Sequence, residues 1–570
     1  MRVKSDVLII GTGGAGLRAA IELHDSGADV LVLGKCEKGK AHTIQATGGI
    51  NAALGTMDPE DTWQLHAADT IRDGDFINDP KAVEILCRNA PKAVEELQKW
   101  GCPFAKDKSG KIVQRFFGAA TYRRACFVGD YTGKAILDTL VRQVEKRKIR
   151  FLEKIYIFSL LTSGKKVNGA MGLAIKSGKI VVFHAKKVIL ATGGHSRMFS
   201  RCSSHFWESN GDGISLAYHL GAKFMDMEMF QFHPTGMVWP HEAEGLLVTE
   251  SVRGEGGILT NAKGERFMKR YDPERMELSA RDIVARAIFF EIKAGRGTKK
   301  GAVYLDISHK PKKYIMERLP KMYRQLKKYN KIDITKNKME VAPTAHYSMG
   351  GLLVDNKTGK TGIRNLFAVG EVTSGVHGGN RLGGNSLAEI MVFGRLAGQS
   401  VAKELKRSSW LPLDTEQITQ KEDELLSMLS AEGEDPVQAK KDIQKMMMEN
   451  AGVIREEGGM RAALEMLDFF GEMQLKTGKS LKNNPALSAA LDIRNMLPTC
   501  RMILLSAMER KESRGAHYRS DLPGPSGEWL KNIICQPGRK GIKIIKRKVP
   551  PASFGVRLLL KKKAEPHLLE

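Results

Sequence analysis

Three glycines near the N-terminus have a spacing that suits the binding of a phosphate group. Gly11, Gly13 and Gly16 form the pattern G-x-G-x-x-G, with Gly14 and Ala15 inside it. Small residues let the backbone turn tightly and approach a pyrophosphate at the N-terminus of a helix. Because the pattern joins an apolar strand (DVLII) to a helix (AGLRAAIELHDSG), it predicts a dinucleotide site.

The choice between NAD and FAD depends on residues elsewhere in the chain. The second apolar strand ends at Gly34-Lys35, so the acidic residue that usually binds the ribose is missing. The segment ATGG at 191–194 and the pair Gly370-Glu371 after a late strand are both features of FAD folds. Their occurrence in this order favours FAD.

Apolar runs at 6–10, 28–34, 186–194 and 365–371 indicate that one sheet is built from distant pieces of the chain. Continuous apolar runs are expected of parallel strands that are buried on both faces. We therefore predict an α/β protein whose Rossmann-like FAD-binding domain is formed by residues 1–228 and 346–405. An inserted α+β capping domain is predicted at 229–345, with a helix around 279–292, and a helical domain follows at 406–522. The proline-containing, basic segment 523–570 is predicted to be a short C-terminal domain in the form of an irregular tail.

Length and composition limit the class of protein. A chain of 570 residues is expected to form three or four structural units. No apolar run reaches the ~18–20 residues of a membrane-spanning helix, and the N-terminus shows no leader peptide. We therefore expect a protein of the cytoplasm, or of the matrix if a leader was removed. The seven cysteines form no C-x-x-C pair, which predicts free thiols and no metal or iron–sulfur site within this chain.

The formal net charge of +26 has more than one explanation. A Lys-rich solvated surface is one, and an acidic partner, an anionic membrane surface or nucleic acid is another. A nucleic-acid-binding flavoprotein is disfavoured because the basic residues are widely spread and aromatic residues, at 7%, are few for base stacking. We therefore expect no nucleic-acid partner.

The chain resembles the succinate dehydrogenase/fumarate reductase flavoprotein family in eight segments that follow the family's order. They are HTIQATGGINAAL (42–54), NGDG (210–213), QFHPTG (231–236), LVTESVRGEGG (247–257), SARDIVARAI (279–288), PTAHYSMGG (343–351), HGGNRLGGNSL (377–387) and KESRGAHYR (511–519). The resemblance implies an FAD enzyme that interconverts succinate and fumarate. It also implies that electrons pass to quinone through an iron–sulfur subunit.

By this resemblance, His42 is the residue that attaches FAD covalently through the 8α-methyl group of its isoalloxazine ring. The glycine pattern and the resemblance together give the other expected cofactor-binding residues. They are Gly11, Thr12, Gly13, Gly14, Ala15, Gly16, Gly34, Lys35, Thr43, Gly48, Gly49, Gly193, Asp212, Glu371, Asn385, Ser386 and Leu387.

The resemblance also implies a site for a dicarboxylate. Arg381 would bind one carboxylate in a bidentate geometry, and His346, His233 and Thr249 would supply further donors. Arg281 would transfer the proton, with Glu250 and Arg253 as the relay that resupplies it, because an arginine with a pKa above about 12 is a poor acid or base alone. From the residues alone, His233 and His346 could equally be core or loop histidines without a catalytic task.

L-aspartate oxidase is the alternative within the same fold. It lacks a histidine at the position of His42, and it typically differs where this chain reads NRLGGNSL, so both features favour the succinate/fumarate branch. The same resemblance implies membrane anchor subunits beside the iron–sulfur subunit. We therefore expect a peripheral protein at the inner face of the cell membrane.

Overall fold

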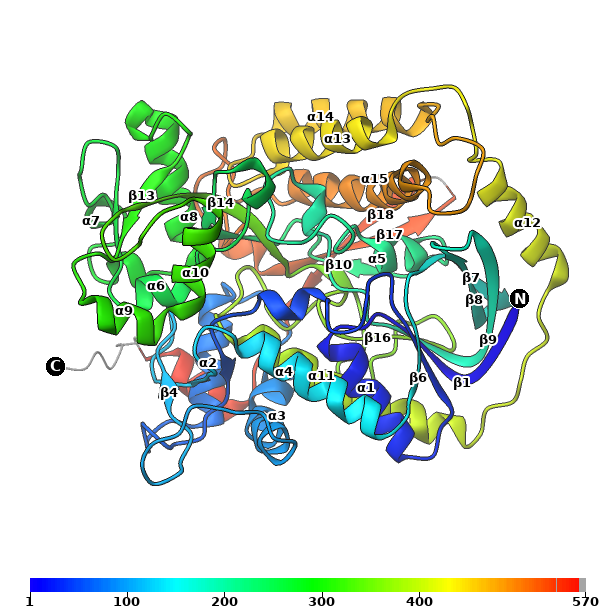
Figure 1. Ribbon diagram of the computed structural model, residues 1–570, viewed down its shortest axis with the longest axis horizontal. Coiled ribbons are helices and arrows are strands. Elements are labelled where there is room, and N and C mark those ends of the chain that lie inside the picture. Colours follow the sequence, from blue (N-terminus) through cyan, green and yellow to red (C-terminus); the bar gives the residue numbers. More distant parts are fainter. Residues whose placement is uncertain (540, 563–570) are drawn as a thin grey trace.

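The central element of the fold is a mixed β-sheet. In the computed structural model, which describes residues 1–539 and 541–562, this sheet has seven strands in the order β6-β2-β1-β9-β8-β7, and β16 also pairs with β9 (Figure 1). Strands β6 (Arg150–Leu152), β2 (Val30–Leu33), β1 (Arg2–Ile10), β9 (Lys179–Leu190) and β16 (Leu366–Ala368) run parallel. The antiparallel strands are β7 (Ile155–Ser163) and β8 (Lys166–Ala174). The prediction of one sheet made from distant segments is confirmed.

One face of this sheet is covered by helices α1 (Gly14–Asp25) and α11 (Asn385–Leu405), which pack against each other. Gly394 and Gly398 allow this close contact. A Cβ atom would lie 2.8 Å from the Ala15 carbonyl oxygen at Gly394 and 2.8 Å from Glu22 Cβ at Gly398. Further out lie α2 (Trp63–Asp73), α3 (Pro80–Lys99), α4 (Thr132–Lys146) and a small sheet of β3 (Ile50–Asn51), β5 (Ala125–Cys126) and β4 (Gln114–Arg115).

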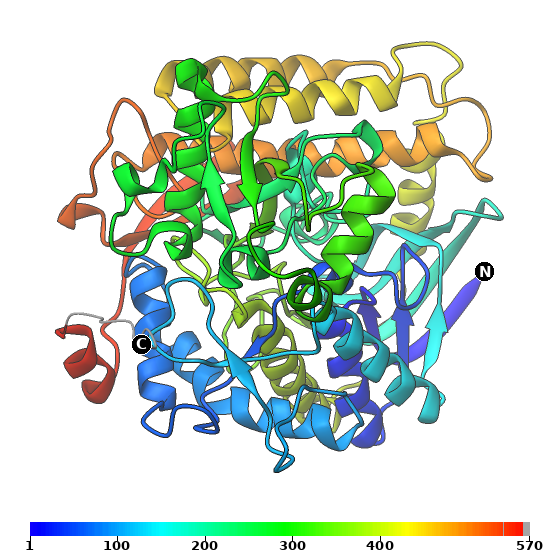
Figure 2. The same cartoon turned by 60° about the vertical axis from the view of Figure 1, so that its left-hand side comes forward.

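The insertion between the sheet strands forms a unit with its own core, which Figure 2 turns toward the viewer. Its sheet has the order β11 (Phe230–Met237), β14 (Met339–Ser348), β13 (Val303–Asp306) and β12 (Ile258–Thr260). Helices α6 (Glu250–Gly254), α7 (Met268–Tyr271), α8 (Arg281–Glu291), α9 (Lys312–Arg318) and α10 (Pro320–Tyr329) surround it. The helix predicted around 279–292 is α8.

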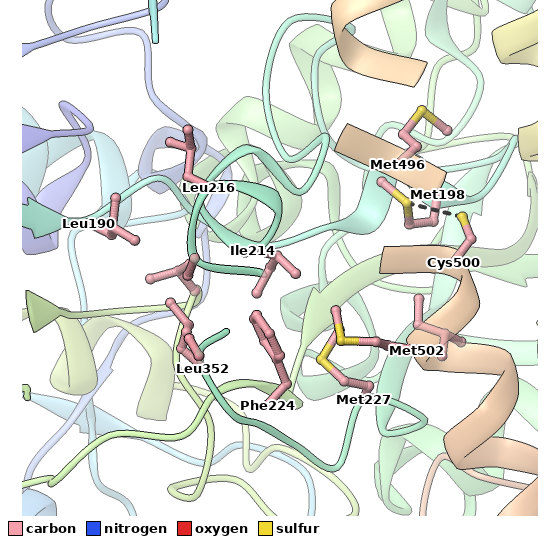
Figure 3. Close-up of a cluster of buried hydrophobic side chains, with 14 of the residues drawn as sticks. Leu190, Met198, Ile214, Leu216, Phe224, Met227, Leu352, Met496, Cys500 and Met502 are labelled. Carbon is pink, nitrogen blue, oxygen red and sulfur yellow. Dashed lines mark hydrogen bonds between the residues drawn. The ribbon is translucent and has the colours of Figure 1, made fainter. Parts of the chain in front are cut away.

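The segment predicted to be helical contains α12 (Thr415–Leu426), α13 (Pro436–Ala451), α14 (Glu457–Glu472) and α15 (Pro485–Glu509). Asp414, Asp435 and Asn484 cap the N-termini of α12, α13 and α15 with their side chains. Helix α15 also reaches the core beneath the main sheet. Figure 3 shows its Met496, Cys500 and Met502 beside Met198 and Met227, with the Cys500 thiol 3.3 Å from the Met198 sulfur.

The prediction of an irregular C-terminal tail was wrong. Strands β17 (Lys531–Gly538) and β18 (Gly541–Lys548) form a hairpin that extends β15 (Gly351–Leu352) and β10 (Phe224–Met225), and α16 (Phe554–Leu560) packs on α2 through Val556. The alternation GIKIIKRK is the signal of a half-exposed edge strand, and the prolines around it obscured that signal. Residue 540 and residues 563–570 of the predicted tail lie outside the described residues.

None of the helices in the described part of the chain combines the length and the apolar character that crossing a bilayer requires.

Candidate active site

A cradle of backbone lies at the carboxyl ends of β1 and β9, where α1 begins. Gly11 has a φ of +123°, and a Cβ atom there would lie 2.0 Å from the Ala191 carbonyl oxygen. The backbone of Gly13 caps α1, and the Gly14 N–H donates to Thr43 Oγ1 at 3.1 Å. This combination of a tight glycine turn and a helix N-terminus is suited to a pyrophosphate.

The cradle opens into a cavity of about 160 Å³. Most of the expected cofactor-binding residues line it: Gly11, Thr12, Gly13, Gly14, Ala15, Lys35, His42, Thr43, Gly193, Asp212, Glu371, Ser386 and Leu387. The structure adds residues that the sequence did not indicate, among them Cys36, Thr192, Trp207, Glu208, Ser209 and Tyr347. Of these, Thr192 and Tyr347 could have been found, because they lie within the ATGG (191–194) and PTAHYSMGG (343–351) segments.

Five of the expected cofactor residues lie elsewhere. Gly16 and Gly34 pack beneath the turn, where a Cβ atom would meet the Gly11 carbonyl oxygen or Thr12. Gly48 and Gly49 line a neighbouring cavity instead. The Asn385 side chain is buried in hydrogen bonds with Asn51, His66 and Thr70, so it does not reach the cofactor cavity.

Lys35 lies where an acidic residue would normally bind a ribose. Its Nζ is 3.0 Å from Asp212 Oδ2 in α5 (Asp212–Tyr218) and 2.8 Å from Asp492 Oδ1 in α15. Burial disfavours the ammonium, but the two carboxylates outweigh it and raise the pKa of Lys35. Since Asp212 also lines the cavity, a ribose hydroxyl can reach a carboxylate there, although not the one that the usual pattern supplies.

The residues expected to bind a dicarboxylate come together around a second, smaller cavity of about 40 Å³. His233, Thr249, Glu250, Arg281, His346 and Arg381 all line it, together with Phe117, Leu247 and the loop 45–49. Arg381 lies over the Tyr347 ring at 4.4 Å, and its Nη1 donates to Ser386 Oγ at 3.3 Å. Two arginines in a buried cavity provide the charge that an anionic substrate requires.

Arg281 and Glu250 form a buried ion pair. Arg281 Nε donates to Glu250 Oε2 at 2.8 Å, Nη2 donates to the same oxygen, and Nη1 donates to Gln231 Oε1 at 3.0 Å. Burial alone would raise the pKa of Glu250, but Arg281 and Arg253 lower it to about 2, so its carboxylate is ionised. Gln231 was not among the predicted residues, although it begins the QFHPTG segment.

Arg253 lies outside the cavity lining, one helical turn beyond Glu250 in α6. Its Nη1 donates to the Glu277 carbonyl at 2.5 Å, while Nε and Nη2 have no hydrogen-bond partner in the described part of the chain. Burial lowers the pKa of Arg253, and the Glu250 carboxylate opposes this shift.

His233 and His346 are neutral in the folded protein. Burial lowers the pKa of each ring well below 6.5, and neighbouring arginines add to the shift, Arg281 for His233 and Arg381 for His346. The rings meet edge to face, with centroids 5.4 Å apart. His233 Nδ1 accepts from the Thr235 N–H at 3.2 Å, so its Nε2 carries the proton and can donate to a substrate oxygen.

The two cavities share a wall, because Ala46, His346 and Ser386 line both. A small anion between the two arginines would therefore lie against the cofactor. The cofactor cavity also contains a buried hydroxyl, Thr192 Oγ1, that has no partner among the described residues. Together with the glycine cradle, this makes the cavity fit a dinucleotide cofactor.

Comparison with known proteins decides the family. Residues 6–387 match the model of the FAD binding domain, and residues 440–560 match that of the fumarate reductase flavoprotein C-terminus. The chain belongs to the succinate dehydrogenase/fumarate reductase flavoprotein family. The FAD-binding match covers more than half of the chain, and so FAD is its cofactor.

Similar proteins extend over nearly all of this flavoprotein chain. One subunit of the fumarate reductase (CoM/CoB) from Methanothermobacter marburgensis is 43% identical over 93% of this chain and 96% of its own length. The succinate dehydrogenase flavoprotein subunit of Rickettsia bellii is 37% identical, over 93% of this chain and 92% of its own. Among solved structures, E. coli quinol fumarate reductase superposes with a TM-score of 0.91 at 31% identity, covering 98% of this chain and 99% of that one.

These relatives confirm the predicted fold class and the predicted reaction class. The chain is an FAD-dependent oxidoreductase of the succinate dehydrogenase/fumarate reductase type, and the alternative of an L-aspartate oxidase is not supported. Adenylylsulfate reductase from Archaeoglobus fulgidus, at 20% identity and a TM-score of 0.80, shares the fold alone.

All seven cysteines lie within the described ranges and none forms a disulfide there.

Proposed function

We propose that this flavoprotein interconverts succinate and fumarate, and that its substrate occupies the cavity between Arg281 and Arg381. The observation that carries the proposal is the wall shared by the two cavities, since a four-carbon diacid in the smaller one would lie against the cavity that would hold FAD. FAD supplies hydride exchange with one of the two central carbons of the substrate. The side chains of this chain must then bind two carboxylates and move one proton.

Binding is divided between the two ends of the substrate. Arg381 offers its guanidinium to one carboxylate, and its Nε has no partner among the described residues, so it is available for that bond. His233, His346 and Thr249 face the same cavity as neutral donors. Neutral donors beside a guanidinium bind a dianion without adding excess positive charge, which would hold the product too tightly.

Arg281 is the proposed proton donor and acceptor. It lies in the cavity, and the ionised Glu250 behind it keeps the guanidinium in place and can exchange a proton with it. Arg253, next to Glu250 on α6, would continue the relay away from the cavity. The relay is needed because the high pKa of a guanidinium makes its deprotonated form rare.

FAD is proposed to be attached covalently to His42. This histidine lines the cofactor cavity at the side where the smaller cavity adjoins, with its ring centroid 6.2 Å from that of His346. A bond at the 8α-methyl group would raise the flavin's reduction potential, which favours oxidation of the unactivated succinate.

Electrons are proposed to leave through an iron–sulfur subunit held at the cytoplasmic face of a membrane anchor. Within the described residues, no group of three or more His, Cys, Asp or Glu side chains could hold a metal ion. An iron–sulfur subunit would carry single electrons from the flavin to a quinone. The Mycobacterium smegmatis relative, 39% identical with a TM-score of 0.86, was solved in complex with UQ1, which supports a quinone as the acceptor.

A second electron partner is favoured by the Methanothermobacter marburgensis relative, whose name couples fumarate reduction to CoM and CoB. The two candidates separate in one experiment. The complex purified with a tagged chain is supplied with fumarate and either a reduced quinone or the CoM/CoB pair, and succinate is measured. Succinate formation with reduced quinone supports the iron–sulfur and membrane proposal, whereas formation only with CoM/CoB replaces it.

The reaction itself is tested on the isolated flavoprotein with artificial dyes. Fumarate should oxidise a reduced viologen, succinate should reduce an oxidised dye, and aspartate should do neither. Failure with both dicarboxylates while FAD is fully bound would contradict the proposed substrate.

A further inference from the structure

A buried carboxylate touches the histidine proposed to hold FAD. Glu208 Oε1 lies 3.2 Å from His42 Nδ1, and Ser204 Oγ lies 3.3 Å from the same nitrogen. Both side chains are largely buried, with 11% of Glu208 and 18% of His42 exposed. Glu208 was not among the residues expected from the sequence, and it lines the cofactor cavity.

The segment 203–209 holds Glu208 in this position. The His205 N–H donates to Glu208 Oε1 at 2.9 Å, and the His205 ring stacks on Trp207 with centroids 4.7 Å apart. The same ring lies 3.1 Å from Gln45 Nε2, three residues after His42. Burial lowers the pKa of His205, so its neutral ring can accept from the amide. Three contacts therefore join this segment to the loop that carries His42.

The contact determines which nitrogen of His42 is engaged and which is free to react. An ionised carboxylate only accepts hydrogen bonds, so Nδ1 must be the protonated nitrogen. In the neutral ring Nε2 then has a free electron pair, and His42 lines the cofactor cavity. Burial lowers the pKa of His42, but Glu208 outweighs burial and raises it, so the neutral ring that attacks is in equilibrium with the imidazolium that Glu208 stabilises. The other charged or titratable groups that act on His42 are Glu371 and Arg381, and the rings of His346 and His205 lie near it.

We propose that Glu208 is the positioning residue for covalent attachment of FAD, because it orients His42 so that Nε2 attacks the 8α carbon and then stabilises the imidazolium that forms. This inference rests on the proposed covalent bond to His42. A carboxylate that binds the second nitrogen of a reacting imidazole supports both its tautomer and its positive charge.

The step balances in atoms and electrons. The 8α-methyl group gives up one proton, which ends on the flavin ring, and the C–H electron pair enters the ring system. His42 Nε2 supplies the pair for the new C–N bond and becomes part of an imidazolium that keeps its Nδ1–H toward Glu208. The flavin is left reduced by two electrons, and fumarate, the substrate of the proposed activity, takes these electrons with protons and becomes succinate.

The test compares the full-length wild type with Glu208→Gln and Glu208→Asp, all produced and incubated with FAD and fumarate. Total FAD is measured by absorbance, and covalent FAD by fluorescence of the denatured band and by peptide mass. Glu208→Gln should retain total FAD, while attachment slows by about 10- to 100-fold, the same range as the loss of a carboxylate that orients a metal-binding histidine. Glu208→Asp should regain part of the rate, because it keeps a carboxylate.

Glu244→Gln is the matched control, since Glu244 pairs with Arg201 at 3.0 Å and not with His42. It should attach FAD like the wild type. A Glu208→Gln protein with the wild-type share of covalent flavin, or Gln and Asp variants that are equally impaired, overturns the role of the carboxylate. A wild type without any covalent flavin overturns the proposed attachment itself, and this inference with it.

Discussion

Asp492 of α15 binds Lys35 at the end of β2, although 457 residues separate them in the chain. The carboxylate also accepts from Lys440 Nζ at 2.7 Å and from the Tyr156 hydroxyl at 2.8 Å. Burial opposes its ionisation, but Lys35 and Lys440 lower the pKa of Asp492. This one carboxylate therefore joins the helical unit to the edge of the cofactor cavity.

Replacing this carboxylate should destabilise the protein strongly. In Asp492→Ala, the buried ammonium groups of Lys35 and Lys440 would lose the negative charge that neutralises them. The free energy of unfolding should fall by about 3–5 kcal/mol. Urea unfolding of the variant and the wild type measures the difference. Asp468→Ala is the control, because Asp468 is 65% exposed beside Arg501 and its loss should cost about 1 kcal/mol or less. Equal losses in the two variants would contradict the role of Asp492.

Buried histidines should make the folded state sensitive to acid. Burial lowers the pKa of His195 to about 3, and both ring nitrogens have no hydrogen-bond partner in the described part of the chain. In the unfolded chain the ring titrates near 6.5, so the unfolded state binds one more proton between these pH values. The contribution of His195 to the free energy of unfolding is therefore fully present above about pH 6.5. Below that pH it falls by about 1.4 kcal/mol for each pH unit.

His195→Phe removes that proton uptake and packs a similar ring against Phe230. The variant should lose about 1.4 kcal/mol less per pH unit than the wild type between pH 6 and pH 4.5. Unfolding free energies from urea titrations at several pH values give this slope. His241→Asn serves as the comparison, since His241 is 86% exposed and its surroundings change little on unfolding. An unchanged slope in His195→Phe would show that His195 is not the group that titrates.

The sequence allowed the main sheet and the insertion to be predicted, because these depend on local patterns, whereas the dicarboxylate residues were expected from the family resemblance. The glycine turn at Gly11 and the buried strands have signals that occupy a few adjacent residues. The contacts of Lys35 with Asp492, and of His42 with Glu208, depend on side chains 457 and 166 residues away, and no local pattern encodes them. The hairpin at 531–548 was missed for another reason. Its alternating apolar and basic residues indicate a strand, but the prolines nearby favoured the prediction of an irregular tail.

Covalent attachment has a direct test at His42. The wild type should retain fluorescent flavin on a denaturing gel, and His42→Ser should bind FAD only without a covalent bond. That variant should still reduce fumarate but lose most succinate oxidation, because the flavin potential falls. Both directions are measured with artificial dyes at equal FAD content. A wild type that releases all its flavin on denaturation would refute the covalent bond.

Arg381 should determine substrate affinity. Burial lowers its pKa to about 10, and Arg281 adds to this shift, so the guanidinium is still charged at neutral pH. Arg381→Met would remove the partner of a buried substrate carboxylate, with an expected loss of about 2–5 kcal/mol. The loss should appear as a higher KM or dissociation constant for fumarate. Binding that is unchanged in this variant would place the carboxylate elsewhere in the cavity.

Arg281→Lys separates proton transfer from binding, because lysine keeps the positive charge but lacks the planar guanidinium that binds Glu250 and Gln231 together. Dicarboxylate binding and FAD content should stay near those of the wild type. The kcat should fall by about 10²–10⁴-fold in both directions, roughly 3–5 kcal/mol of transition-state stabilisation, because every turnover moves one proton. Dye assays give kcat and KM, and ligand titration gives binding. If kcat stayed within a few-fold and only KM rose, Arg281 would be a binding residue, and His233 or His346 would be the next candidates for the proton transfer.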